Sequence, residues 1–136
     1  MAAFSWPVRV YYEDTDAGGV VYYANYLRFM ERARTEWLRS LGFEQDELMR
    51  DPGILFAVRR AEVDYLRPAR LNDRLLVISR LTRVAGASLD FAQQIRRDDE
   101  EPVLCEGRVR VVCLRAGDLR PTRIPQQMLD RFPSQD

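Results

Sequence analysis

The sequence contains neither histidine nor lysine, although it is 136 residues long. Without histidine there can be no Ser-His-Asp or Cys-His catalytic group and no histidine metal ligand. Without lysine there is no Schiff-base amine and no Walker A phosphate-binding loop. If the protein is an enzyme, its chemistry must therefore depend on carboxylates, hydroxyls, arginines and backbone amides.

Cysteine is scarce as well. Cys105 and Cys113 are the only two in the sequence, and both fall in one predicted strand. Eight residues of extended chain span about 26 Å, well beyond the roughly 7 Å limit between the Cα atoms of a disulfide. Two cysteines also make a poor zinc site. We therefore expect no bound metal and two reduced, buried thiols in a cytoplasmic protein.

Long apolar runs and an excess of charge are also missing. The start, MAAFSWPVRV, lacks the basic residues and sustained apolar core of a signal peptide, and no later run is long enough to cross a membrane. The 21 basic and 21 acidic residues cancel, so no overall field favours nucleic acid or an anionic membrane. We expect neither partner, and one domain over residues 1–136.

The hydrophobic periodicity predicts one long helix among five strands. From about Asn25, apolar residues recur at spacings of three and four as far as Leu41, and Gly42 is a suitable helix end. Strands are expected at residues 7–12, 56–66, 74–84, 89–97 and 103–114, and short helical segments at 44–51 and 125–131. The hairpin spacing favours an antiparallel sheet that wraps the helix, an α+β architecture.

The most informative segment is YYEDTDAGGVVYYANYLRFME, residues 11–31. It contains an acidic cluster and two glycines directly before the predicted helix: Glu13, Asp14, Asp16, Gly18 and Gly19. A carboxylate at such a position can combine a base or nucleophile with backbone N–H groups that stabilise an oxyanion. The alternative is an acidic turn that only caps the helix.

This segment resembles the signature of the 4-hydroxybenzoyl-CoA thioesterase family, especially its YbgC-like branch of bacterial acyl-CoA thioesterases. The matching residues are 12–22, then 24–26 and 31–34, and the order of the later elements fits as well. The resemblance implies a hot-dog fold, in which a five-stranded antiparallel sheet wraps a long central helix. It also implies homodimers or homotetramers, and hydrolysis of acyl-CoA thioesters without a metal or redox cofactor.

One position departs from the branch. YbgC-like members usually carry histidine where this sequence has Tyr23. The hydroxybenzoyl-specific branch likewise has an aromatic residue other than histidine there. The departure therefore leaves the central chemistry of the family in place and excludes a histidine-assisted variant.

The resemblance maps Asp16 onto the carboxylate that attacks the thioester carbonyl or activates a water. The composition supports this assignment, because without histidine a carboxylate is the ordinary base available near neutral pH. Gly18 and Gly19 would let an acyl group approach backbone N–H donors, and the amide near Tyr23 is the implied oxyanion donor. Asp14 is expected to support the loop through hydrogen bonds.

Other candidates keep more than one interpretation. The Tyr23 side chain could line an acyl pocket, donate its hydroxyl or pack against the helix. Asn25 stands where an N-cap is expected, so capping is its first interpretation and substrate contact its second. Some arginines on the predicted strands could bind CoA phosphates or simply face solvent: Arg59, Arg60, Arg83, Arg96 and Arg97.

The sequence thus predicts an acyl-CoA thioester hydrolase that releases a carboxylic acid and free CoA. A hot-dog dehydratase is disfavoured because that chemistry usually employs histidine. The other alternative is a non-catalytic module that binds acyl-CoA or an acyl carrier protein and serves envelope or phospholipid machinery. Asp16 beside Gly18 and Gly19 argues against that module, because a scaffold without activity has no need of this arrangement.

Overall fold

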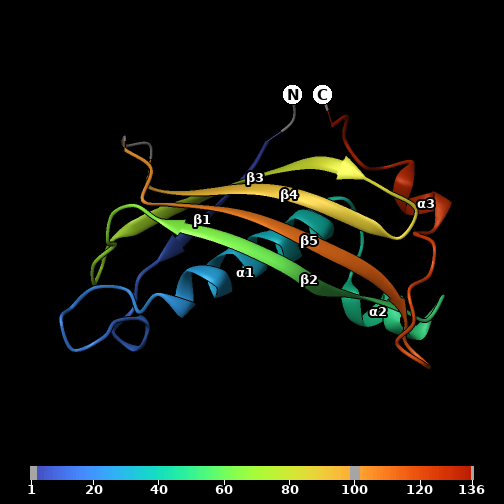
Figure 1. The fold of residues 1–136 in the computed structure, drawn as a ribbon, viewed down its shortest axis with the longest axis horizontal. Coiled ribbons are helices and arrows are strands. Elements are labelled where there is room, and N and C mark those ends of the chain that lie inside the picture. The colour runs from blue at the N-terminus through green and yellow to red at the C-terminus, as the bar shows by residue number, and fades with distance from the viewer. Residues whose placement is uncertain (1–2, 99–101, 136) are drawn as a thin grey trace.

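A five-stranded antiparallel sheet curves around one long helix in the computed structural model, which describes residues 3–98 and 102–135 (Figure 1). The strands are β1 (Phe4–Arg9), β2 (Ile54–Tyr65), β3 (Arg74–Val84), β4 (Ser88–Arg97) and β5 (Cys105–Arg115). Their order across the sheet is β1-β3-β4-β5-β2. The helices are α1 (Ala24–Ser40), α2 (Gln45–Arg50) and α3 (Gln126–Leu129), with a 3₁₀ turn η1 (Tyr12–Asp14). The predicted α+β hot-dog fold is confirmed.

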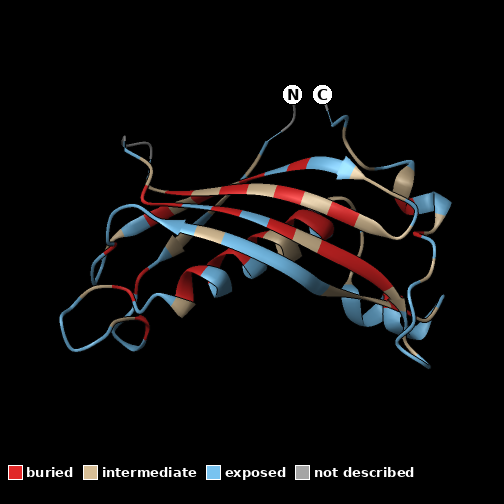
Figure 2. Ribbon diagram, in the orientation of Figure 1, coloured by how far each residue is buried: buried red, intermediate tan, exposed pale blue. Residues whose placement is uncertain are grey.

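The core lies between α1 and the inner face of the sheet, and Figure 2 shows the buried side of α1 turned toward the strands. The buried residues of α1 are Asn25, Tyr26, Phe29, Met30, Ala33, Trp37 and Leu38. Their spacing of three and four places them on one side of a helix. The predicted apolar stripe is confirmed, apart from Leu27, which is exposed, and Leu41, which is half-buried.

The three central strands alternate buried and more exposed residues, as the period of two in the sequence predicts. Leu75 and Val77 of β3, Phe91 of β4 and Val109 of β5 all face the helix side and are buried. Gly107 of β5 lies where a Cβ atom would come within 2.8 Å of the Met30 Sδ and Cε atoms. Glycine at this point of the strand therefore lets α1 lie close to the sheet.

The first strand differs from the prediction. Residues 7–12 were expected to be extended, but β1 ends at Arg9 and Tyr12 enters η1. The physical reason is the Asp14 carboxylate, whose Oδ2 accepts a hydrogen bond of 2.8 Å from the Tyr11 amide and curls the chain. Pro7 lies inside β1, which is possible because β1 is an edge strand.

The inner face of β2 also differs from the prediction. The alternation in the sequence alone predicts one face with Ala57, Ala61, Val63 and Tyr65, but Ile54 and Phe56 pack against the core in the first half of the strand and Val63 does so in the second half. The pairing with β5 shifts between Val58 and Arg60, so that Arg59 has no partner residue. One extra residue in a strand reverses the side on which each later side chain lies, which explains the change of face.

A buried glutamine joins the helix to the sheet. Gln93, on β4, is 1% exposed, and its Nε2 donates to the Met30 carbonyl (3.0 Å) and to the Ser79 hydroxyl (2.8 Å). Its Oε1 accepts a hydrogen bond of 2.9 Å from Nη1 of Arg34. Gln93 is not among the residues predicted from the sequence, although a polar side chain in an otherwise apolar alternation is a detectable signal.

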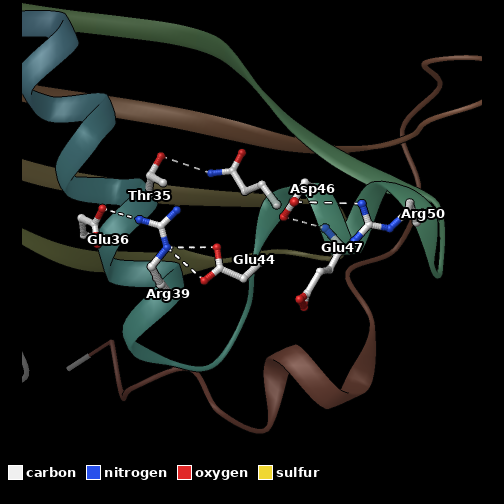
Figure 3. A network of polar contacts seen from close by, with 8 residues as sticks. Thr35, Glu36, Arg39, Glu44, Asp46, Glu47 and Arg50 are labelled. Carbon is white, nitrogen blue, oxygen red and sulfur yellow. Dashed lines mark hydrogen bonds and ion pairs between the residues drawn. The ribbon is translucent and has the colours of Figure 1, made fainter.

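Polar contacts connect the end of α1 to α2 (Figure 3). Arg39 Nε donates to both carboxylate oxygens of Glu44 at 3.0 Å, and the same guanidinium pairs with Glu36. Gln45, the first residue of α2, donates to the Thr35 hydroxyl at 3.3 Å. These contacts place α2 against the C-terminal half of α1.

The two edges of the sheet are unlike. β1 has six residues and includes a proline, whereas β2 has twelve residues and none. Residues 58–62 of β2 are all exposed, and Figure 2 shows this strand as mostly exposed.

In the part of the chain that the structure describes, no helix combines the length and apolar character needed to cross a membrane.

Candidate active site

Asp14 organises the loop between β1 and α1. It is buried, and its carboxylate accepts the Tyr11 N–H while its own carbonyl accepts both the Tyr22 N–H and the Asn25 Nδ2, each at 2.9 Å. One residue thus fastens the start of the loop, the end of the loop and the first turn of α1. The expectation that Asp14 supports the loop is confirmed.

Asp16 lies at the start of a tight turn beyond this anchor. Its amide donates to the Val20 carbonyl at 2.9 Å, and its carbonyl accepts the Gly19 N–H at 3.0 Å. Its Oδ1 accepts the Gly18 N–H at 2.8 Å, and the residue is exposed. One carboxylate oxygen is therefore fixed by the turn, and Oδ2 has no hydrogen-bond partner among the described residues.

The two glycines have structural roles in this turn. Gly19 has a φ of +78°, which favours glycine. A Cβ atom on Gly18 would lie 3.3 Å from the Asp16 Oδ1 that the Gly18 amide holds. Both amides are occupied by Asp16, so neither N–H is free to bind an oxyanion in this arrangement.

The start of α1 supplies a free amide. Among the described residues, none accepts a hydrogen bond from the Tyr23 N–H. Tyr23 itself occupies the N-cap position and makes no side-chain cap. The interpretation of Asn25 as the N-cap is wrong, because Asn25 lies inside the helix and its side chain binds the Asp14 carbonyl instead.

The connection between β2 and β3 supports the Asp16 loop from outside. The Ala69 carbonyl accepts the Val21 N–H at 2.8 Å, and the Leu71 N–H donates to the Gly19 carbonyl at 3.3 Å. The Ala69 N–H in turn donates to the Tyr26 hydroxyl at 3.0 Å. No local pattern in the sequence predicts this support, because it joins residues more than forty positions apart.

Tyrosines surround the start of the helix. The Tyr23 ring is 60% exposed and lies 4.9 Å from the Tyr22 ring and 6.0 Å from the Tyr65 ring, between centroids. Tyr65 also lies 5.6 Å from Tyr26. Partial burial raises the pKa of Tyr65, and the hydrogen bond with the Tyr23 side chain raises the pKa of Tyr22, so both phenols stay neutral near pH 7. Tyr65, at the end of β2, is not among the site residues predicted from the sequence.

The cysteines are poor candidates for a nucleophile. Both are buried and free. Burial raises the pKa of Cys105 to about 12, with Asp64 and Glu106 adding to the effect, and burial raises the pKa of Cys113 to about 11. The reactive form of cysteine is the thiolate, which neither residue forms to a useful extent at neutral pH.

The candidate phosphate-binding arginines do not form one cluster. Arg83 pairs with Asp90, near the turn between β3 and β4, whereas Arg97 lies toward the other end of β4 and is held by Asp73 and by the Pro68 carbonyl. Arg60 pairs with Glu62 on β2. Most of these guanidinium groups therefore have structural partners.

Comparisons with known proteins agree with this geometry. The family model described as the thioesterase-like superfamily matches residues 10–132. The acyl-CoA thioesterase YbgC of Haemophilus influenzae is 44% identical over 95% of this chain and 93% of its own length. The acyl-CoA thioester hydrolase YbgC of Escherichia coli O6:H1 is 47% identical over 95% of both chains. A crystal structure of a probable thioesterase from Bartonella henselae superposes with a TM-score of 0.86, at 35% identity, over 91% of this chain and 100% of that one.

The chain belongs to the thioesterase-like superfamily. The relatives named YbgC match it over nearly its whole length, so the resemblance to that branch expected from residues 12–34 is confirmed.

The anchoring role of Asp14 leads to a stability prediction. Asp14→Ala should lower the free energy of unfolding by about 1–3 kcal/mol, because the Tyr11 amide loses its acceptor in a buried setting. Asp14→Asn keeps one acceptor oxygen and should cost less. Urea unfolding followed by circular dichroism measures both. Glu13→Ala, a change at the exposed neighbour, is the matched control; equal losses in Asp14→Ala and Glu13→Ala would contradict the anchoring role.

Proposed function

We propose that the protein hydrolyses acyl-CoA thioesters to a carboxylic acid and free CoA, with Asp16 as the catalytic carboxylate. The observation that carries the proposal is the position of Asp16: an exposed carboxylate with one oxygen fixed by the Gly18 amide, in the loop that leads to α1. The names of the YbgC relatives, which match nearly the whole chain, support the same activity.

The free carboxylate oxygen, Oδ2, carries the chemistry in this mechanism. It attacks the thioester carbonyl carbon, or removes a proton from a water that attacks instead. Either route makes a tetrahedral intermediate with a negative oxygen, which expels the CoA thiolate and gives a mixed anhydride or the free acid. On the direct route, water then hydrolyses the anhydride, which gives the free acid and restores the Asp16 carboxylate. On the water route, the protonated Asp16 passes its proton to the departing CoA thiolate and becomes a carboxylate again.

The developing negative charge requires a donor close to the carbonyl oxygen. The Tyr23 N–H serves in this role, because it is unpaired at the start of a helix of seventeen residues and the positive end of the helix dipole favours an anion there. Gly18 and Gly19 contribute by shaping the turn and leaving it open. Asn25 contributes through Asp14 and makes no contact with the substrate. No metal or redox cofactor takes part in these steps.

The active protein is proposed to be a homodimer, or a homotetramer made of two such dimers, and β2 joins the two protomers of each dimer. A long edge strand with unpaired N–H and C=O groups is a site for pairing. β2 fits this role better than β1, because it is twice as long and has no proline. Two copies related by a two-fold axis would pair their β2 strands antiparallel and form one continuous sheet.

The mechanism predicts the effect of Asp16→Asn. Asparagine preserves the shape and the Oδ1 acceptor for the Gly18 amide, but it is neither a base nor an efficient nucleophile. Turnover of acyl-CoA substrates should fall by a factor on the order of 10² or more, while folding, assembly and CoA binding remain. Release of free thiol from a panel of acyl-CoA substrates measures this.

Asp14→Asn is the control for Asp16→Asn, and its effect should follow the loss of stability. Near-normal hydrolysis by folded Asp16→Asn protein would exclude the carboxylate mechanism. Saturable binding of acyl-CoA without turnover in the wild type would instead indicate a non-catalytic binding module.

The Tyr23 amide leads to a second prediction. Tyr23→Phe keeps the peptide N–H and removes only the hydroxyl, so it should retain most of the turnover, within about threefold. The rate of hydrolysis at saturating substrate, compared with the wild type, is the measurement. If a folded Tyr23→Phe protein lost turnover completely, the hydroxyl rather than the amide would be the catalytic group.

The proposed assembly leads to a third prediction. Sedimentation at micromolar concentration should show a dimer or tetramer, because an isolated protomer leaves the β2 edge unpaired. Dilution until the complex dissociates should reduce the activity per protomer, with circular dichroism as the check that protomers stay folded. A stable monomer with full activity would overturn this proposal.

A further inference from the structure

A cavity of about 430 Å³ lies between the C-terminal half of α1 and the sheet. Its apolar walls are formed by residues from one helix and three strands: Trp37, Leu38, Phe56, Val58, Phe91 and Val111. This volume is in the range of small-molecule sites in proteins. The cavity reaches β2, the strand at the free edge of the sheet.

A half-buried arginine lies at the wall of this cavity. Arg34 lines the cavity, and burial lowers the pKa of its guanidinium, although the group stays a cation at neutral pH. Its Nη1 donates to Gln93 Oε1 at 2.9 Å, and no carboxylate lies within ion-pair distance among the described residues. Glu31 attracts this half-buried cation without forming an ion pair with it, so the guanidinium loses part of its hydration for a weak electrostatic compensation.

The position of Arg34 is fixed by the sheet. The Nε2 atom of Gln93 donates to the Met30 carbonyl and to the Ser79 hydroxyl, so Oε1 must face Arg34. The amide thus holds one edge of the guanidinium and leaves its other N–H groups for another acceptor. Glu31, Thr35 and Gln45 add polar groups to the lining of the same cavity, and Gln45 is bound to the Thr35 hydroxyl (Figure 3).

Within one protomer this cavity is distant from the proposed catalytic group. Eleven residues of α1 separate Tyr23 from Arg34, about 16 Å at roughly 1.5 Å per residue. In the proposed dimer, by contrast, the catalytic loop of the partner comes close to this cavity. If two β2 strands overlap fully and run antiparallel, the partner's Tyr65 lies opposite Ile54, close to Phe56 and the cavity. Because Tyr65 and Tyr23 rings are in contact, the partner's Asp16 loop approaches the cavity as well.

We propose that this cavity receives the acyl group of a thioester held at the partner's Asp16, and that Arg34 selects acyl groups carrying an oxygen acceptor at their far end. The proposal rests on the function proposed above and names its substrate class. Two kinds of acyl group provide such an oxygen: an aliphatic chain with a terminal carboxylate, and an aromatic ring with a hydroxyl. Arg34 donates to either oxygen, while Glu31 repels the carboxylate and accepts a hydrogen bond from the hydroxyl.

Matched substrate pairs test the selection. Hexanoyl-CoA and adipoyl-CoA differ by a terminal carboxylate, and benzoyl-CoA and 4-hydroxybenzoyl-CoA differ by a hydroxyl. In the wild type, kcat/KM should favour the oxygenated member of at least one pair. Arg34→Met should reduce that preference about tenfold or more, since a hydrogen bond to a charged group is lost, while kcat/KM for the unsubstituted member stays within about twofold. Arg34→Lys should restore part of the preference.

A second variant separates the two sources of the oxygen. If the natural acyl group carries a carboxylate, Glu31→Gln should raise kcat/KM for adipoyl-CoA. If the natural acyl group carries a hydroxyl, the same change should lower kcat/KM for 4-hydroxybenzoyl-CoA. Arg28→Met removes an exposed arginine from the same helix and is the control for loss of charge. Sedimentation and circular dichroism confirm that each variant is folded and assembled.

The outcomes separate a failure of this proposal from a failure of the proposed hydrolase function on which it rests. If the wild type and Arg34→Met show the same ratio within both pairs, Arg34 does not select the acyl group, even where Asp16→Asn still abolishes hydrolysis. Loss of Asp16 dependence would instead remove the proposed function itself. A uniform loss of kcat/KM on all four substrates in folded Arg34→Met would assign Arg34 a structural role and also overturn the proposal.

Discussion

The structure depends on the burial of one face of α1 in the curved sheet. An isolated helix of this length is marginal in water, and each large apolar side chain that it buries contributes about 1.5–3 kcal/mol. Phe29 and Met30 are completely buried near the start of the helix, and Trp37 packs edge-to-face on Phe91 farther along. Because this contact fixes the helix on the sheet, it also fixes where the first turn of α1, and therefore the Asp16 loop, is placed.

The loop is held by a small number of hydrogen bonds, two of which involve side chains of this fixed helix. Asp14 joins the loop to Asn25 on α1, and Tyr26 joins α1 to Ala69 in the connection before β3. These bonds involve buried side chains, whereas Asp16 itself is exposed. The loop therefore combines a rigid hydrogen-bonded support with an accessible carboxylate, as the proposed role of Asp16 in catalysis requires.

Much of the fold could be predicted because its signals are local. The spacing of apolar residues along α1 and the alternation along β3, β4 and β5 follow directly from helix and strand periods. The errors arose where a single residue changes the local geometry. The Asp14 side chain curls the chain after β1, and Arg59 adds one residue to β2; neither effect is visible in periodicity.

The candidate site was predictable only in part for the same reason. The run of acidic residues and glycines indicated Asp16, and it also indicated a supporting role for Asp14. It could not show that the Gly18 and Gly19 amides are used within the turn, because this depends on how the carboxylate and the backbone carbonyl of Asp16 are oriented. Tyr65, Ala69 and Gln93 contact residues that are far away in the sequence. No spacing pattern within a single sequence predicts such contacts.

The unpaired residue in β2 has a consequence for how the protein can change over time. Phe56 and Val63 both face the core only because Arg59 stands between them without a partner. The register of β2 therefore depends more on the number of residues in the strand than on the identity of most of them. Removal of one residue between Phe56 and Val63 would place one of these two side chains on the outer face of the sheet. Substitutions along this strand therefore preserve its register, whereas a single-residue insertion or deletion shifts it.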